Sequence, residues 1–252
     1  MKYNGIDPRS LHPGISINKE IPPGTVTSQL ETLAGSDGEI IAGRTIQQGE
    51  YIVRVNIAGK YKAQAWEIRK MLAGWARSAD IVTHELIPTH WPTVAYDAIL
   101  KEISEPEFVM GFATIDVVFA LPRPIAHDLI EKGTLMEMGV DTHTITVKGT
   151  SHARPWISAD LLETSSVSIL VDGETRIRLK GPFTLGSILE VYCNPPRVTL
   201  KAPGVALQDA NERIDYTGTD FTAFEKAFTP GEHTVTVDGA DSISVNWKEE
   251  WL

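Results

Sequence analysis

Alternation of apolar and polar residues is the feature that most limits how this chain can fold. In the stretch EYIVRVNIA, Tyr51, Val53, Val55 and Ile57 fall on one side of an extended backbone. Short runs of this kind recur along most of the chain, separated by Pro, Gly, Asp and Asn residues that favour turns. The pattern predicts a mainly β protein.

One stretch departs from this alternation, YKAQAWEIRKMLAGWARSA at residues 61–79. Its apolar residues recur at helical spacing: Ala65, Ile68, Leu72, Trp75 and Ala76. The spacing predicts a single long amphipathic helix. Gly74 lowers the stability of such a helix by about 1 kcal/mol relative to Ala, so we expect tertiary packing to hold it.

Proline residues divide the chain into two halves. Pro122 and Pro124 stop the β-prone run FVMGFATIDVVFAL, because proline cannot donate a hydrogen bond to a sheet. An irregular segment follows, and strands alone follow that. We therefore expect an N-terminal β-sandwich domain with one long α-helix and a β-hairpin at 1–130. An antiparallel β-sandwich domain is expected at 131–252.

Two Asp-Gly pairs mark turns in the second half. Asp172 and Gly173 lie between SVSILV and ETRIRLK, which predicts a tight hairpin in which both residues have positive φ. A second pair, Asp238 and Gly239, separates HTVTV from SISVNW. On the latter strand Trp247 shares a face with Ile243, so we expect it in the core.

Composition excludes several classes of protein. The net charge of −10 argues against a nucleic-acid-binding surface, because phosphates are neutralised by clustered Lys and Arg. No apolar run reaches the roughly 18 residues that span a bilayer, and MKYNGIDPRS lacks the apolar core of a signal peptide. The lone Cys193 excludes an intrachain disulfide and fits folding in a reducing cytoplasm.

Motifs with catalytic chemistry are absent from the sequence. The string THELIPTH places His84 and His90 six residues apart with Pro88 between them, which is incompatible with a helical zinc motif. Glycine-rich phosphate motifs and a Gly-x-Ser-x-Gly elbow do not occur. Cys193 ends the apolar run SILEVYC, which favours a buried, inert thiol. We expect no enzyme activity, catalytic residue, metal or cofactor.

A sugar-binding role is the alternative that the sequence leaves open. In YCNPPRVTL, Asn194 and Arg197 lie at a strand junction where they could contact glycan hydroxyls, and Trp156 is a candidate exposed aromatic residue. A turn stabilised by local hydrogen bonds of Asn194 is the competing interpretation. Trp251 has no assigned role.

Six motifs, in order along the chain, resemble the distal tail proteins of long-tailed (siphovirus-type) bacteriophages. They are GSDGEIIAGRTI, EYIVRVNI, WEIRKMLAGWA, FATIDVVFALPRP, GTSHARPWISA and FTPGEHTVTVDGADSISVNW. The resemblance covers nearly the whole chain. One departure is His233, where members of that family commonly carry Asn, and the carbohydrate-binding insertion of some larger relatives is missing.

The resemblance implies a fold and a set of partners. The second domain would be a galectin-like β-sandwich, and six copies would form a homohexameric ring through the first domain. That ring would join the tail tube protein to a tail-associated hub or lysin protein and to receptor-binding or baseplate proteins. DNA would pass through the lumen without sequence-specific contacts. The protein would be assembled in the bacterial host cytoplasm and located at the virion tail tip.

The single helix has a place in this hypothesis. One stripe of it would pack on its own subunit, leaving other faces for a neighbour, although burial within one monomer is the alternative. The residues expected at the subunit interface are Trp66, Arg69, Lys70, Arg77, Tyr96 and Phe112. Two other functions remain as alternatives: a carbohydrate-binding adhesin recognising host cell-wall glycans, and a hydrolase with a carboxylate pair.

Overall fold

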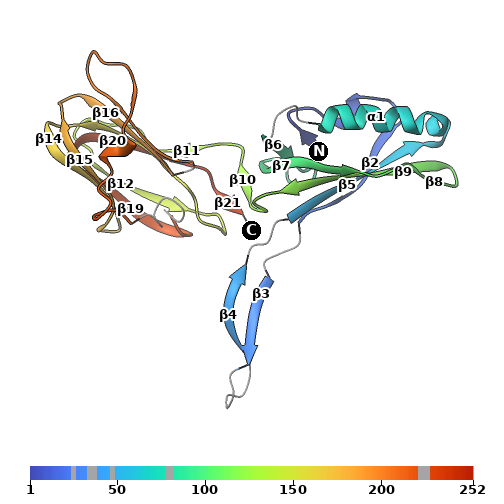
Figure 1. Ribbon diagram of the computed structural model, residues 1–252, viewed down its shortest axis with the longest axis horizontal. Helices are drawn as coiled ribbons and strands as arrows, with labels where there is room; N and C mark the ends of the chain where they lie inside the picture. Colours follow the sequence, from blue (N-terminus) through green and yellow to red (C-terminus); the bar gives the residue numbers. More distant parts are fainter. Residues whose placement is uncertain are drawn as a thin grey trace. The chain divides into compact units, whose positions relative to one another are not determined.

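A computed structural model describes residues 1–23, 27–32, 39–45, 49–77, 82–193, 195–220 and 228–251. These residues divide into two compact units, Met1–His127 (unit 1) and Asp128–Trp251 (unit 2). Strands dominate both units, and α1 (Ala65–Ala76) is the one α-helix of the described residues, as Figure 1 shows. The predicted mainly β fold with a single helix is therefore confirmed.

Unit 1 is built on one antiparallel sheet with the strand order β1-β6-β7-β9-β5-β2. Its central strands β5 (Gly49–Ala58) and β9 (Phe112–Leu121) pair along their whole lengths. Both alternate between buried and partly exposed residues, because side chains along a strand point to opposite faces. The other strands are β1 (Lys2–Tyr3), β2 (Ile15–Ile21), β6 (His84–Ile87) and β7 (Val94–Ile103).

The sheet of unit 1 is strongly curved. Tyr3 in β1 and Phe119 in β9 are three strands apart in the sheet, yet their ring centroids are 4.6 Å apart. Neighbouring strands are about 4.8 Å apart, so a flat sheet would place the backbones of these two strands roughly 14 Å apart. The rings of Tyr3 and Phe119 thus belong to one aromatic cluster, in which Trp75 of α1 contacts both.

The helix α1 packs on this sheet through the predicted stripe. Ala65, Ile68, Leu72 and Ala76 are completely buried, and Trp75 is partly buried. The helix is shorter than expected, because residues 59–64 form a tighter 3₁₀ turn, η2 (Gly59–Gln64). Its predicted last residues, 78 and 79, lie outside the described residues.

The predicted strand FVMGFATIDVVFAL is in fact two strands. β8 (Glu107–Val109) turns back on β9 through Met110 and Gly111, whose φ of 89° is in the left-handed region. A residue with a Cβ rarely adopts that conformation, so glycine fixes the turn. Two further strands, β3 (Thr27–Thr32) and β4 (Glu39–Thr45), pair in a sheet of their own.

Unit 2 is a sandwich of two antiparallel sheets. The four-stranded sheet has the order β12-β19-β14-β15, and the six-stranded sheet has the order β11-β20-β13-β16-β17-β18. Buried residues from both sheets form one core cluster. The bounds are β11 (Lys132–Gly133), β12 (Thr142–Val147), β13 (Trp156–Leu161), β14 (Thr164–Val171), β15 (Glu174–Phe183), β16 (Ser187–Cys193), β17 (Pro196–Lys201), β18 (Gln208–Asp209), β19 (Gly231–Asp238) and β20 (Ala240–Trp247).

Short elements complete the chain. They are η1 (Pro8–Ser10), β10 (Ala126–Asp128), η3 (Asn211–Arg213) and β21 (Glu250–Trp251). The expected core position of Trp247 is confirmed, and the indole of Trp251 donates a 2.9 Å hydrogen bond to Oδ1 of Asp128. Among the described residues, no helix has the length and apolar character needed to cross a bilayer.

Candidate interaction surface

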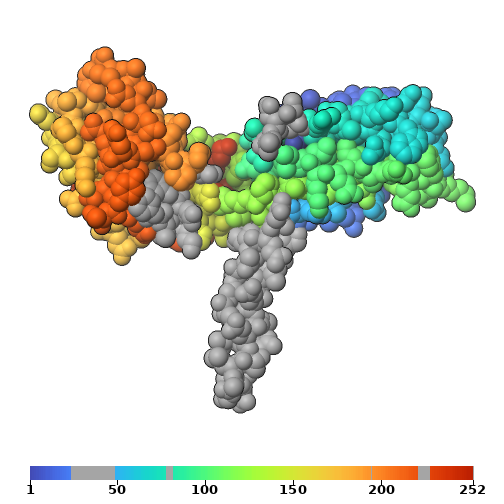
Figure 2. All heavy atoms as spheres, in the orientation of Figure 1, coloured from blue at the N-terminus to red at the C-terminus, as the bar shows by residue number. Residues whose placement is uncertain are grey.

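The side of α1 that faces away from its sheet carries both apolar and charged side chains. Trp66 is 48% exposed, and Lys70, Met71 and Arg77 are also exposed. Within the part of the chain that the structure describes, neither Lys70 nor Arg77 forms a salt bridge. We call this surface, which also includes the exposed Glu67 and Gly74, the outer face of α1. In Figure 2 the helix is the cyan region of unit 1.

Arg69 has a different role from its neighbours on the helix. Its Nε donates to the carbonyl of Ser104 at 2.8 Å, and its Nη2 donates to the carbonyl of Ile103 at 2.9 Å. These two carbonyls lie at the end of β7, where the strand leaves the sheet. The guanidinium therefore ties α1 to its own sheet.

Tyr96 and Phe112 offer little surface to a neighbouring subunit. Tyr96 in β7 is only 9% exposed, and its ring centroid lies 5.8 Å from that of Tyr51. Phe112, the first residue of β9, is half-buried and opposite Ala58 of β5. These positions favour a packing role within unit 1.

The connection between β7 and β9 forms a second exposed surface, which we call the tip. It carries two exposed acidic residues and three exposed apolar ones: Glu105, Glu107, Phe108, Val109 and Met110. Nζ of Lys62 donates a 2.9 Å hydrogen bond to the carbonyl of Val109 and lies 5.6 Å from the ring centroid of Phe108. The backbone of the tip is thus held in place by η2, and its side chains are exposed to solvent, where another molecule could contact them.

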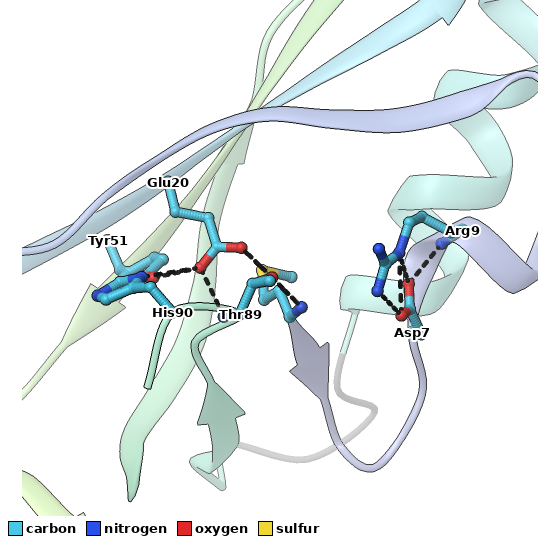
Figure 3. Close-up of polar contacts among 7 residues, drawn as sticks. Asp7, Arg9, Glu20, Tyr51, Thr89 and His90 are labelled. Atoms are coloured by element: carbon cyan, nitrogen blue, oxygen red, sulfur yellow. Dashed lines mark hydrogen bonds and ion pairs between the residues drawn. The ribbon is translucent and has the colours of Figure 1, made fainter. Parts of the chain in front are cut away.

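A buried carboxylate in unit 1 was not singled out from the sequence. Glu20 in β2 accepts hydrogen bonds from the Tyr51 hydroxyl (2.8 Å) and from the backbone N–H of Thr89 (3.0 Å), as Figure 3 shows. The Thr89 hydroxyl also donates to Glu20 and accepts from the amine of Met1. Burial raises the pKa of Glu20, but these hydrogen bonds outweigh it and lower the pKa. A carboxylate held ionised in this way links β2 to β5 and does not suit proton transfer.

The histidines of THELIPTH do not form a metal site in this arrangement. His84 lies in β6, with its ring 5.8 Å from that of Tyr3, whereas Nδ1 of His90 lies 3.7 Å from Glu20. A strand sends its side chains to alternating faces, and Pro88 ends this strand. Among the described residues, no group of three or more His, Cys, Asp or Glu side chains could hold a metal ion.

Cys193 is buried in the core of unit 2, as predicted. Burial raises the pKa of its thiol to about 12, and the nearby charge of Arg154 only partly offsets that effect. The thiolate, which is the nucleophilic form, is therefore scarce at neutral pH.

Two of the three candidate glycan residues belong to one ladder across the six-stranded sheet. Trp156 in β13 stacks on Tyr192 in β16, with centroids 5.6 Å apart and planes 7° apart. The guanidinium of Arg197 in β17 lies 4.4 Å from the centroid of Tyr192. The third candidate, Asn194, lies outside the described residues. Two residues before Tyr192 on the same strand, Oε2 of Glu190 accepts a hydrogen bond from the Tyr192 hydroxyl at 3.1 Å.

The similarity of this chain to known proteins lies in its structure and not in its sequence. No protein-family model matches the sequence, and no curated protein matches it. Among solved structures, the crystal structure of "SPP1 Dit (gp 19.1) Protein, a Paradigm of Hub Adsorption Apparatus in Gram-positive Infecting Phages" aligns over 99% of this chain and 98% of its own length. The TM-score is 0.73 at 14% sequence identity. This chain has the Dit fold.

A second structure with a similar fold is a chain of "the Phage P2 Baseplate in its Activated Conformation with Ca". It covers 94% of this chain and 90% of its own length, with a TM-score of 0.54 and 9% identity. The Dit fold thus spans both units, which confirms at the level of fold the resemblance to distal tail proteins. Within the Dit fold of this chain, the outer face of α1 and the tip both belong to unit 1.

Proposed function

We propose that this protein is a structural component of a bacteriophage tail tip. It would form a ring, most simply of six copies, at the distal end of the tail tube. One side of the ring would bind the tube protein, and the other would bind hub or lysin and receptor-binding or baseplate proteins. The lumen would let DNA pass, and no bond would be made or broken by its side chains.

The observation that carries this proposal is the extent of the match to SPP1 Dit. A single β-sandwich is common among unrelated proteins and says little about function. Here two β units with one helix align in one chain order over 99% of the protein. SPP1 Dit is a paradigm of the hub adsorption apparatus in phages that infect Gram-positive bacteria, and the P2 chain comes from a baseplate. Two neighbours from tail tips support the same role here.

The exposed surfaces of unit 1 agree with self-assembly. The outer face of α1 and the tip each expose large apolar side chains beside charges. Stable ring contacts bury on the order of 1,000 Å² or more around apolar anchors. Trp66 and Phe108 are side chains of the kind that serve as such anchors.

Two measurements test the proposed function. Light scattering and negative-stain microscopy of the purified protein should show a closed ring with a mass of several copies. Gold-labelled antibody on intact virions should bind where the tube meets the tip. A monomer at every concentration, together with label elsewhere on the particle, would overturn the proposal. Hydrolysis of peptidoglycan by the purified protein would establish an enzyme instead.

A glycan-binding role is the second candidate, favoured by the ladder of Trp156, Tyr192 and Arg197. Aromatic rings beside a guanidinium and a carboxylate suit the apolar faces and hydroxyls of a sugar. Calorimetry with host cell-wall polysaccharide should then show binding that Trp156→Ala removes. Tyr216→Ala, at an exposed site elsewhere in unit 2, is the control and should bind normally. Equal heats from all three proteins would exclude this site.

A further inference from the structure

The described residues of unit 1 give no structural reason for a glycine at position 74. It lies in the last turn of α1, does not have a positive φ, and is exposed. A Cβ placed there would meet no atom of the described residues within 4 Å. Within a helix, glycine lowers the folding equilibrium constant by up to about fivefold relative to alanine. The chain thus keeps a residue that weakens its only described α-helix while leaving open space beside it.

Other glycines of unit 1 show what an internal requirement looks like. A Cβ on Gly59 would lie 2.3 Å from the carbonyl oxygen of Gly111, and one on Gly14 would lie 2.4 Å from the ring of Tyr61. These positions exclude side chains because their own unit fills the space. At Gly74 no described atom of the unit fills that space, so the glycine leaves room for another backbone to approach the helix closely.

The chemistry around Gly74 limits what could approach. The outer face of α1 carries two exposed cations, Lys70 and Arg77, and one exposed carboxylate, Glu67, so its balance is basic although the whole chain has a net charge of −10. Trp66 and Met71 add exposed apolar surface. A complementary partner would therefore present acidic and apolar side chains on a narrow backbone turn.

The tip has this chemistry. Glu105 and Glu107 supply two exposed carboxylates, and neither forms a salt bridge among the described residues. Phe108 and Val109 are exposed, and Met110 at the turn is 94% exposed. Because Lys62 already fixes the backbone at Val109, the tip would lose little conformational entropy on binding.

We propose that the tip of one copy packs on the outer face of α1 of the next copy, with its backbone turn against Gly74. The contact joins two different surfaces, so it is heterologous and closes into a ring when the rotation per subunit divides a full turn. This inference rests on the proposed function, since it specifies how the ring is held together. It assigns Lys70 and Arg77 to face Glu105 and Glu107.

Substitutions at Gly74 test the close approach, because folding and assembly should respond in opposite directions. Gly74→Ala should raise the folding equilibrium constant by up to about fivefold, while weakening ring association. Gly74→Leu should fold normally and reduce association by about tenfold or more, because a larger side chain blocks the turn. Thr144→Leu, which adds the same side chain at an exposed position of β12, is the control and should assemble like the wild type.

Charge exchange tests the identity of the partner. Lys70→Glu with Arg77→Glu should prevent ring formation, and Glu105→Lys with Glu107→Lys should do the same. A chain with all four changes should form rings again, because every contact then pairs a reversed helix with a reversed tip. Restoration by the fourfold variant would be hard to explain by any other contact.

The outcomes separate the inference from the proposed function. A wild-type ring that persists in the Gly74→Leu and charge-reversed variants would overturn the contact and leave the tail-tip role intact. Absence of a ring from the wild type, with no copy at the tail tip of virions, would overturn both. Analytical ultracentrifugation across a range of salt concentrations would give the association constants, and the ion pairs should make the wild-type value fall as salt increases.

Discussion

Nζ of Lys132 donates a 2.6 Å hydrogen bond to Oε1 of Glu249, a carboxylate whose side chain has no exposed surface. The other oxygen, Oε2, accepts from the backbone N–H groups of Lys148 (2.8 Å) and Gly149 (2.6 Å). The indole N–H of Trp247 donates to Oε1 at 3.3 Å. One buried side chain therefore satisfies four donors from three segments of unit 2.

Removing this charge should destabilise unit 2 strongly. We expect Glu249→Gln to lower the free energy of unfolding by about 3 kcal/mol, because breaking a buried pair leaves Lys132 and two N–H groups poorly satisfied. Urea unfolding followed by far-UV circular dichroism measures the change. Glu163→Gln removes an exposed carboxylate and should change stability by less than about 0.5 kcal/mol. Equal stabilities for the two variants would contradict the buried role of Glu249.

A surface pair in unit 1 should behave very differently. Arg54 in β5 donates through Nε and Nη2 to the two oxygens of Asp116 in β9, at 2.8 and 2.7 Å. Both side chains are substantially exposed, so solvent screens their attraction. A double-mutant cycle with Arg54→Ala and Asp116→Ala should give a coupling of about 0.5 kcal/mol. The coupling should shrink in 1 M salt, and a value above 2 kcal/mol would show that the pair is not screened.

Much of the fold follows directly from local sequence. The alternation in EYIVRVNIA appears as four completely buried residues of β5. Helical spacing likewise identified the four buried residues of α1. These patterns are predictable because each reports the period of its own backbone.

The two Asp-Gly pairs show where local sequence becomes insufficient. At Asp172 and Gly173 both φ values are positive, 54° and 80°, and the chain makes the expected hairpin. At Asp238 and Gly239 only the glycine has a positive φ, and the chain passes from the four-stranded to the six-stranded sheet. Which outcome occurs depends on the strands that pair on either side, and the dipeptide does not encode them.

The candidate surfaces were predictable only in part. Helical spacing indicated that Glu67, Lys70 and Arg77 point away from the stripe, and they are exposed. The inward bonds of Arg69 depend on two carbonyls more than 30 residues away, which no local pattern reveals. The tip was also missed, because FVMGFATIDVVFAL is one β-prone run in the sequence, whereas the chain turns within it at Gly111, which has a positive φ.

The hairpin turn at Asp172 should make part of the stability of unit 2 pH-dependent. Oδ2 of Asp172 lies 2.7 Å from Nδ1 of His233, and Oδ1 accepts from the N–H of Thr234 at 2.8 Å. Burial raises the pKa of Asp172, but these hydrogen bonds lower it by more. The contribution is therefore present above the unfolded-state pKa, about 3.9, and disappears as the pH falls through the lower pKa of the folded state.

The matched variant for this turn is Asp172→Asn, because asparagine also tolerates the positive φ and can still accept from Thr234. Its free energy of unfolding should fall less steeply than that of the wild type as the pH is lowered from 5 to 2. Urea titrations at several pH values measure the two curves. Parallel curves would mean that the carboxylate of Asp172 carries no folding-linked proton.

Cys193 should be unreactive in the folded protein, although it is the only thiol of the chain. Its pKa is raised to about 12 by burial, and reaction with a disulfide reagent requires both the thiolate and access to it. At pH 8 the folded protein should therefore react with 5,5′-dithiobis(2-nitrobenzoate) at least about a hundredfold more slowly than the unfolded chain. In urea, the amount of fast-reacting thiol should increase together with the loss of circular dichroism signal. Because the thiol lies within the core between the two sheets of unit 2, fast reaction before that loss would show that the sandwich opens locally at β16 while the rest of the fold persists.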